Sequence, residues 1–414
     1  MSAFQLFRRM LPDRLRTTNF ALAFIALVFG LTLSLSARAQ TFTVLYAFHG
    51  NLDGVAPEGD LVRDLAGNIY GTTIDGGIGN GTVFKLDKNG REKVLHRFAG
   101  SDGASPWGGV VRDTAGNLYG TTESGGSAGW GVVFKVDAKG QETVLHSFTG
   151  GKDGADPFAP LILDAAGNLY GTTYYGGGGG CDDGFGKGCG VVFKVTPHGR
   201  ETIIHHFALS SGGFNLNGGL LCGPGGVLYG STVSSGFNHA SGTVFRLSRQ
   251  HKEKVLHQFI SDTDGAIPRA GVIRDAAGDL YGTTQWGGHC INGSGCGVVY
   301  KVDPSGKETV LYRFSGKADG KGPTDRLVLD KAGNLYGTTW YGGDFNCNVN
   351  GCGVVFRLRL RDHRFTVLHT FTGKRDGSVP NAGLILDPAG NLYGVAQGGG
   401  DPKYSGGTVF RIKP

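Results

Sequence analysis

The sequence lacks the local signatures of the common catalytic and cofactor-binding classes. It contains no nucleophile elbow, zinc signature or dinucleotide fingerprint. Five consecutive glycines at 176–180 are followed by no helical pattern, so a phosphate group would find no helix N-terminus there. We therefore expect no cofactor, and binding is the leading interpretation over catalysis.

Helical periodicity and long apolar runs are also missing after residue 40. Proline is scarce (14 of 414 residues), whereas glycine is abundant (76) and returns at fixed places instead of gathering in linkers. This pattern indicates many tight turns and excludes a disordered chain. The sequence predicts an all-β protein.

The first 39 residues resemble an export signal. Four arginines precede an apolar run at 20–33, which is followed by Ala37-Arg38-Ala39. A basic region, a short apolar core and an A-x-A site predict a secretory signal peptide at 1–39, cleaved before Gln40. A membrane anchor is the alternative, although the run is short for a stable span. We expect no membrane insertion after removal of the signal and a secreted or periplasmic location.

Removal of this segment leaves a nearly balanced charge. The whole chain is +6, and residues 1–39 contain five arginines and one aspartate, so +6 minus +4 leaves about +2. No long basic run remains. Neither nucleic acid nor an anionic membrane surface is expected as a partner.

A unit of about fifty residues repeats through the rest of the chain. The motif Gly-Asn-Leu-Tyr-Gly-Thr-Thr returns seven times with small changes, its tyrosines being Tyr70, Tyr119, Tyr170, Tyr229, Tyr281, Tyr336 and Tyr393. Each unit has four short segments rich in Val, Leu, Phe, Tyr and Thr, separated by turn residues. We call these segments strands a, b, c and d in chain order.

Seven units of four antiparallel strands predict a seven-bladed β-propeller over residues 40–414. The chain stops after a c strand at 407–414, and residues 41–48 match a d strand. We therefore expect the N-terminal strand to complete the last blade. Such closure removes the open edge that a linear β-solenoid would expose.

The repeat also resembles a known family. The segments Gly-Asn-Leu-Tyr-Gly-Thr-Thr, Gly-Thr-Val-Phe-Lys and Val-Leu-His-x-Phe recur in this order over residues 41–414. They are similar to the GloVer tandem repeat of exported bacterial proteins. This resemblance implies export and a repeat architecture, and it brings no established activity.

The b–c loops and d–a connections of a propeller share one face, and this is the expected functional face. The b–c loops vary in length, whereas the a–b and c–d turns are short and uniform. Aromatic side chains gather in these variable segments, where they either stack on a carbohydrate or cap the blades. The candidate ligand-binding residues are Trp107, Trp130, Tyr174, Tyr175, Trp286, Trp340 and Tyr341.

Three pairs of cysteines occupy the same place in three b–c loops. The pairs are Cys181/Cys189, Cys290/Cys296 and Cys347/Cys352. Behind an export signal they predict three local disulfides, and metal binding is the rival interpretation. The seventh cysteine, Cys222, lies on an a strand and is expected to be buried as a small apolar side chain.

One d-strand position holds a flat ring with a polar tip, histidine in five blades and tyrosine in two (Tyr46 and Tyr312), which indicates packing rather than catalysis. The following Asp-Gly-x-x-Pro connections favour turns. Asp262 and Asp264 are weak candidates for calcium ligands, and we otherwise expect no metal.

Three functions remain open. The leading hypothesis is an exported, monomeric binding or scaffold propeller that recognises a glycan or an extracellular protein. The second is a polysaccharide or glycoside lyase or hydrolase with non-repeated acids and bases at the central channel, and the third is a purely structural surface protein. The off-pattern candidates for catalysis are His289, Asp182, Asp183, Asp344 and His239.

Overall fold

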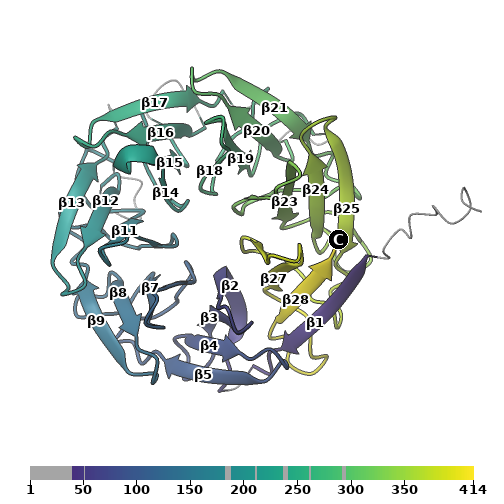
Figure 1. Ribbon diagram of the computed structural model, residues 1–414, viewed down its shortest axis with the longest axis horizontal. Helices are drawn as coiled ribbons and strands as arrows, with labels where there is room; N and C mark the ends of the chain where they lie inside the picture. Colours follow the sequence, from purple (N-terminus) through teal and green to yellow (C-terminus); the bar gives the residue numbers. More distant parts are fainter. Residues whose placement is uncertain are drawn as a thin grey trace, which may run out of the picture. The chain divides into compact units, whose positions relative to one another are not determined.

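The computed structural model describes residues 40–50, 52–181, 188–209, 212–235, 241–260, 263–290 and 295–414. Residues Thr41–Lys413 form one compact unit. This unit consists of seven four-stranded antiparallel sheets arranged in a ring (Figure 1). The predicted seven-bladed propeller is confirmed, and the described residues contain no helix beyond a single 3-10 turn, η2 (Pro224–Gly226).

The blades follow one another in chain order. Blade 1 contains β2 (Val55–Arg63), β3 (Ile69–Asp75), β4 (Thr82–Leu86) and β5 (Glu92–Arg97). Blade 2 contains β6 (Val110–Arg112), β7 (Leu118–Thr122), β8 (Val132–Val136) and β9 (Glu142–Ser147). Blade 3 contains β10 (Ile162–Leu163), β11 (Leu169–Thr172), β12 (Val191–Val195) and β13 (Glu201–His206). Blade 4 contains β14 (Leu221–Cys222), β15 (Leu228–Thr232), β16 (Thr243–Leu247) and β17 (Glu253–Gln258).

The last three blades keep the same order of strands. Blade 5 contains β18 (Ile273–Arg274), β19 (Leu280–Thr284), β20 (Val298–Val302) and β21 (Glu308–Arg313). Blade 6 contains β22 (Val328–Leu329), β23 (Asn334–Thr339), β24 (Val354–Arg359) and β25 (Arg364–Thr370). Blade 7 contains β26 (Ile385–Leu386), β27 (Leu392–Ala396), β28 (Thr408–Lys413) and, from the other end of the chain, β1 (Thr41–Ala47).

Strand β1 closes the ring as predicted. It pairs antiparallel with β28, from Thr41 opposite Lys413 to Ala47 opposite Thr408, with an irregularity between Val44 and Tyr46 (Figure 1). The main-chain groups along β28 that would otherwise lie at a sheet edge are therefore paired. A β-bulge at the same place recurs in the c–d pair of other blades, for example between Val83 and Phe84.

The repeated Tyr motif is explained by one hydrogen-bonded turn between strands a and b. In blade 1, Asp64 Oδ1 accepts the Asn68 backbone N–H at 2.8 Å, and Asp64 Oδ2 accepts the Asn68 side-chain amide at 2.7 Å. The Tyr70 hydroxyl donates to the same Oδ2 at 3.1 Å. Glycine is required after this tyrosine, because a Cβ at Gly71 would lie only 2.8 Å from the Phe84 ring. The aspartate, asparagine, tyrosine and glycine of the motif therefore recur together in most blades.

Aromatic rings fill the space between neighbouring blades. The phenylalanine directly after each d strand packs edge-to-face on the c-strand ring of the next blade, as Phe98 does on Phe134 with ring centroids 5.0 Å apart. Both rings are fully buried. Edge-to-face pairs of this kind add to the apolar burial that drives blade association.

The His or Tyr of each d strand contacts residues of the next blade, in agreement with the packing interpretation. We call this contact between neighbouring blades a joint. His96 Nε2 lies 2.9 Å from Asp102 Oδ2, and Asp102 Oδ1 accepts the Ala99 backbone N–H at 2.7 Å. The first d-strand residue of the next blade completes the joint, with Glu142 beside His96 and Asp102. In the joint between blades 7 and 6 the Glu position holds Phe42, which stacks on His369 at 3.6 Å. Blade 4 has no Asp-Gly motif, and there His205 pairs with Glu253 at 3.2 Å.

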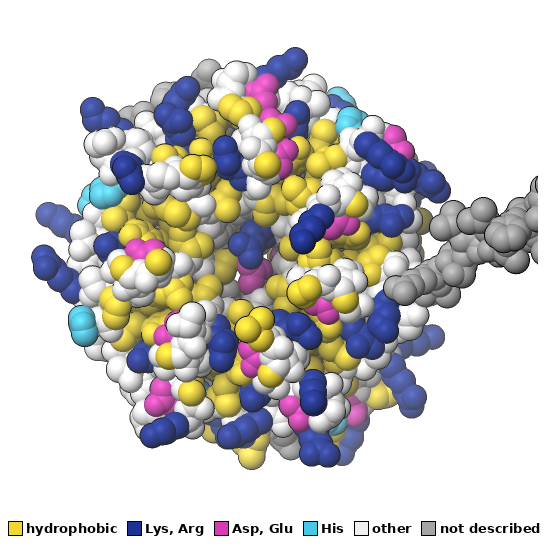
Figure 2. Space-filling view, in the orientation of Figure 1, with side chains coloured by type: hydrophobic (Ala, Val, Ile, Leu, Met, Phe, Trp, Pro, Cys, Tyr) yellow, Lys and Arg dark blue, Asp and Glu magenta, His cyan; other side chains and the backbone are white. Residues whose placement is uncertain are grey.

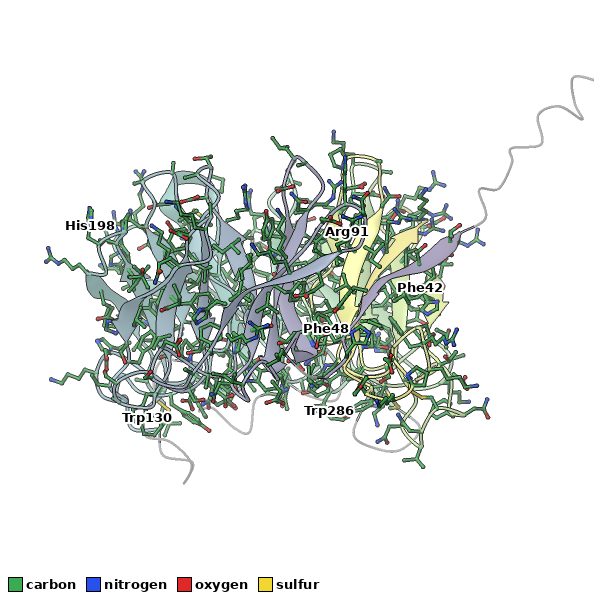
Figure 3. The ribbon with its side chains drawn as sticks, turned by 90° about the horizontal axis from the view of Figure 1, so that it is seen from below. Phe42, Phe48, Arg91, Trp130, His198 and Trp286 are labelled. Carbon is green, nitrogen blue, oxygen red and sulfur yellow. A yellow bond between two sulfur atoms is a disulfide. The ribbon has the colours of Figure 1, made fainter. Side chains whose placement is uncertain are left out.

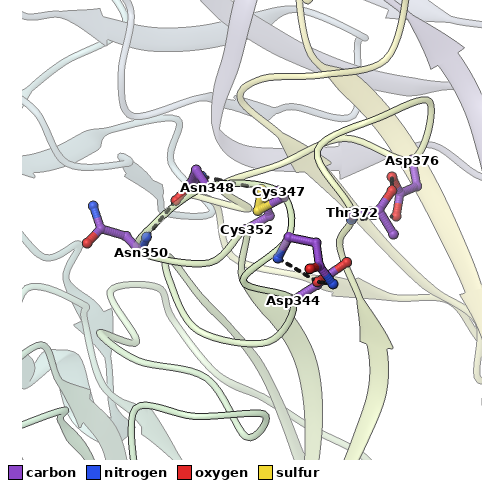
Figure 4. Close-up of a disulfide and its surroundings, with 8 residues drawn as sticks. Asp344, Cys347, Asn348, Asn350, Cys352, Thr372 and Asp376 are labelled. Atoms are coloured by element: carbon purple, nitrogen blue, oxygen red, sulfur yellow. Dashed lines mark hydrogen bonds between the residues drawn. A yellow bond between two sulfur atoms is a disulfide. The ribbon is translucent and has the colours of Figure 1, made fainter.

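The three predicted disulfides are present in b–c loops: Cys181–Cys189, Cys290–Cys296 and Cys347–Cys352. Figure 4 shows the last of these beside the hydrogen-bonded turn of Asp344. Cys222 was expected to be buried, and this expectation is wrong, since its side chain is exposed. It ends the two-residue strand β14 at the place of Leu163 in blade 3, directly before Gly223, which stands where other blades have the aspartate of the a–b turn.

The two faces of the ring carry different loops, as predicted. In Figure 3, Trp130 and Trp286 mark the b–c loops on one face, and Arg91 and His198 mark the c–d turns on the other. The chain also enters its a strands on the first face, through the d–a connections. Among the described residues, no helix is sufficiently long and apolar to cross a membrane.

Candidate functional site

The d–a connections meet at the centre of the ring and are held there by a repeated backbone arrangement. Each contains a residue with a left-handed backbone, such as Asp156 (φ 54°) in blade 3. Its N–H donates to the Trp130 carbonyl at 3.2 Å, and its carbonyl accepts the Tyr174 N–H at 3.1 Å. The connection is thereby tied to the b–c loop of the preceding blade and to the end of strand b of its own blade. The side chains that follow are placed at the channel.

A single pocket of about 500 Å³ occupies this centre. Every blade supplies to it the residue that follows the proline of the Asp-Gly-x-x-Pro connection, or the equivalent residue in blade 4. These residues are Glu58, Trp107, Phe158, Asn217, Arg269, Thr324 and Asn381. A nearly constant repeat thus presents six different residue types at one position. Packing needs alone would favour the same residue in every blade, so this variation makes the pocket the candidate functional site.

Blades 2 and 3 supply an aromatic wall. Trp107 packs edge-to-face on Phe158 with centroids 6.1 Å apart, and Phe158 packs in the same way on Tyr174 at 5.6 Å. Tyr174 in turn meets Tyr175 at 4.7 Å. The Trp107 indole N–H donates to Glu123 Oε2 at 2.6 Å, which fixes the orientation of the ring.

Blades 5, 6, 7 and 1 supply a wall of hydrogen-bonding groups. Arg269 lies over the Trp340 ring at 5.5 Å, and the Trp340 indole N–H donates to Asn381 Oδ1. The Thr324 hydroxyl donates to the same Oδ1 at 3.3 Å. These contacts cross from blade to blade and hold the polar groups at the pocket in fixed positions.

Three carboxyl groups of the pocket have raised pKa values. Burial raises the pKa of Glu58 to about 8, with a further contribution from the charge of Asp325 and an opposing hydrogen bond from Asn381. Burial and the charge of Asp60 raise the pKa of Asp325 to about 7, although the Thr338 hydroxyl donates to it at 2.7 Å. Burial and the charge of Glu123 raise the pKa of Asp156 to about 6. Groups that change protonation near neutral pH can exchange protons with a ligand.

The structure divides the aromatic candidates into two groups. Trp107, Tyr174, Tyr175 and Trp340 line the central pocket. Trp130, Trp286 and Tyr341 lie outside it. Trp130 is 39% exposed and packs against Gly150, and Trp286 lies under the Lys321 ammonium at 5.2 Å. Tyr341 packs edge-to-face on Trp340 at 5.9 Å.

The other candidates do not lie in the pocket. His289 is exposed, and Asp344 caps its own loop by accepting the Asn346 N–H at 2.8 Å. Asp264 accepts the Ile260 N–H at 2.9 Å, as a turn residue does. Asp182, Asp183, His239 and the calcium candidate Asp262 fall outside the described residues.

Sequence reasoning missed the acids and the arginine of the pocket. Glu58, Asp156, Arg269 and Asp325 were overlooked because each lies inside a connection that resembles a plain turn. For Glu58 and Arg269 the available signal was the variable residue that follows the constant proline of these connections. Figure 2 shows the opposite face of the ring, with a hollow at its centre where both basic and acidic side chains are visible.

Comparisons with solved structures show the fold. The extracellular domain of a one-component system from B. thetaiotaomicron matches with a TM-score of 0.55 at 10% identity, over 89% of this chain and 39% of that one. A puromycin-hydrolyzing peptidase from Mycobacterium tuberculosis matches with a TM-score of 0.52 at 12% identity, over 88% and 54%. A gluconolactonase from Xanthomonas campestris matches with a TM-score of 0.43 at 15% identity, over 72% of this chain and 86% of that one. The chain therefore spans about half or less of the first two proteins.

A comparison with curated proteins finds no match. The family comparison is decisive, because the model of the Gloeobacter/Verrucomicrobia repeat matches residues 26–240 and 216–414. Together these ranges include the motifs of all seven blades. The chain belongs to the Gloeobacter/Verrucomicrobia repeat family.

Proposed function

We propose that this protein is an extracytoplasmic binding propeller and that its central pocket recognises a carbohydrate-like ligand. One observation carries the proposal: every blade contributes the same position to the pocket, with six residue types among the seven. The three disulfides fit an oxidising compartment outside the cytoplasm.

The two walls of the pocket complement the two kinds of surface on a sugar. Trp107, Phe158 and Tyr174 offer ring faces and edges to the apolar C–H face of a pyranose. Asn381, Thr324 and the Arg269 side chain offer donors and acceptors to its hydroxyl groups. A volume of about 500 Å³ is within the range of small-molecule sites.

The test is thermal melting of the purified protein against a panel of mono- and oligosaccharides. A ligand at 100 times its dissociation constant stabilises the folded state by about 2.7 kcal/mol. Trp107→Ala should abolish this stabilisation. Trp130→Ala is the matched control, because Trp130 lies outside the pocket, and it should leave the stabilisation unchanged. If no sugar raises the melting temperature, or if Trp130→Ala removes the effect and Trp107→Ala does not, the proposal fails.

A second candidate function is acid–base cleavage of a glycoside in the same pocket. The observation that favours it is the buried Glu58 carboxyl, only 2% exposed, whose raised pKa keeps it largely protonated at neutral pH. A protonated carboxyl can act as a general acid. Glu58→Gln should then lower kcat on a bound glycoside while leaving its binding nearly unchanged. Equal turnover by the variant would exclude this role.

A further inference from the structure

We propose that the ligand of the central pocket carries a protonated amine, whose ammonium group lies against Glu123, Asp156 and the aromatic wall of blades 2 and 3. This inference rests on the proposed function and specifies the class of ligand as an amino sugar or a related cationic polyol. A neutral sugar would leave the Glu123 and Asp156 carboxyl groups without a cationic partner.

The first argument is the balance of charge. Five carboxyl groups line the pocket, Glu58, Asp60, Glu123, Asp156 and Asp325, against two arginines. Burial keeps Glu58 largely protonated at neutral pH, so it adds little negative charge. Both arginines have contacts away from the acids of blades 2 and 3. Arg326 pairs with Asp60 at 2.7 Å, and Arg269 lies over the Trp340 ring. The acids of blades 2 and 3 therefore have no basic partner among the residues that line the pocket.

The second argument is an unfilled hydrogen-bonding site. Glu58 is 2% exposed and lines the pocket, and its Oε1 has no hydrogen-bond partner in the described part of the chain. A buried polar atom without a partner destabilises the folded state. Natural proteins rarely keep such an atom unless a ligand or water satisfies it. A hydroxyl or ammonium donor of the ligand would do so.

The third argument is the shape of the aromatic wall. The Trp107, Phe158 and Tyr174 rings meet edge-to-face, so each presents part of its face or edge at a different angle. Glu123 is held at this wall by its hydrogen bond from Trp107, and Asp156 belongs to the same connection as Phe158. Aromatic faces combined with carboxylates attract ammonium groups through cation–π and ionic contacts.

Cation binding here is linked to protonation. The groups at the pocket that titrate or carry charge are Glu58, Asp60, Glu123, Asp156, Asp325, Tyr174, Tyr175, Arg269 and Arg326. Burial and Glu123 raise the pKa of Asp156 to about 6, so near pH 5 it is largely neutral and near pH 7 largely ionised. A cation binds the ionised form more tightly. Its affinity should therefore rise several-fold between pH 5 and pH 7, with release of protons on binding.

The experiment compares matched cationic and neutral probes by isothermal titration calorimetry on the full protein. The pairs are glucosamine with glucose, and choline with its neutral isostere 3,3-dimethylbutan-1-ol. Choline has no titrating group, so its pH profile reports on the protein alone. We expect each cation to bind at least tenfold more tightly than its neutral partner, and Glu123→Gln or Asp156→Asn to remove that preference. Asparagine tolerates the left-handed backbone at position 156, so this variant should fold.

Asp344→Asn is the control, because Asp344 lies in an exposed b–c loop away from the pocket. It should leave the preference for cations intact. Binding of glucose or another neutral sugar with no gain from the amine would overturn this inference and leave the proposed function standing. Binding of neither the cations nor any sugar would overturn both. An amine preference that survives in both Glu123→Gln and Asp156→Asn would also refute the assigned position.

Discussion

Tyr300 provides the sharpest test of how the blades pack. It occupies the c-strand aromatic position of blade 5, where the other six blades have phenylalanine. Its ring is fully buried against Phe259, with centroids 5.0 Å apart. The hydroxyl is buried as well, and among the described residues it has no hydrogen-bond partner. It lies close above Gly282, where an added Cβ would come within 2.4 Å of it.

We predict that Tyr300→Phe stabilises the protein. Removal of a buried hydroxyl that makes no hydrogen bond should recover about 1–3 kcal/mol of desolvation cost. The ring and its contact with Phe259 would remain. For a unit of roughly 370 residues the entropy of unfolding is about 0.8 kcal/mol per kelvin, so the melting temperature should rise by about 1–4 °C.

The assay is urea unfolding followed by tryptophan fluorescence, together with calorimetry. The reciprocal variant Phe356→Tyr adds a hydroxyl at the same place in blade 6 and should destabilise by a similar or larger amount, because the ring tip already meets Gly337. Loss of stability in Tyr300→Phe would refute the reasoning. It would mean that the hydroxyl has a partner, such as an ordered water, that the strand geometry does not reveal.

Three further predictions concern the joints between blades and the loops. Glu142→Phe should stabilise the protein by about 1 kcal/mol, since it would stack on His96 as Phe42 stacks on His369, and chemical unfolding measures this. Burial raises the folded-state pKa of Glu142 from 4.5 to about 7, so the folded state holds more protons than the unfolded state in this window. Its contribution to stability should fall as pH rises from about 4.5 to 7, and Glu142→Gln should flatten that slope; an unchanged slope would contradict the assignment. Replacement of Cys347 and Cys352 by serine should cost about 2 kcal/mol or less because the two cysteines are only five positions apart, and a loss of folding would show a larger role.

The fold was largely readable from the sequence because the repeat encodes local structure. Within each unit, turn residues bound apolar segments with strand propensity, and a motif such as Asp64 to Tyr70 closes its own turn by hydrogen bonds. Seven copies removed the ambiguity that one copy would have. The paired cysteines were equally local, since each disulfide joins residues five to eight apart.

The pocket depended on the tertiary structure. Glu58, Asp156 and Asp325 are far apart in the chain, and each has an ordinary turn sequence around it. Only closure of the ring brings them to one place, and only burial there raises their pKa values. The prediction that Cys222 is buried also failed, because the burial of a side chain depends on its tertiary neighbours: Leu163, at the same place in blade 3, is half-buried, whereas Cys222 is exposed.

The sequence by itself determined the number of blades, the order of strands, the ring closure and the disulfides, because the repeated motifs, the matching end strands and the closely spaced cysteines are all visible along the chain. The tertiary structure alone decided which of the aromatic residues line the central pocket and which lie outside it. The physical reason is that the pocket is assembled from connections of all seven blades, from Glu58 to Asn381. Residues so far apart in the sequence meet only when the ring closes.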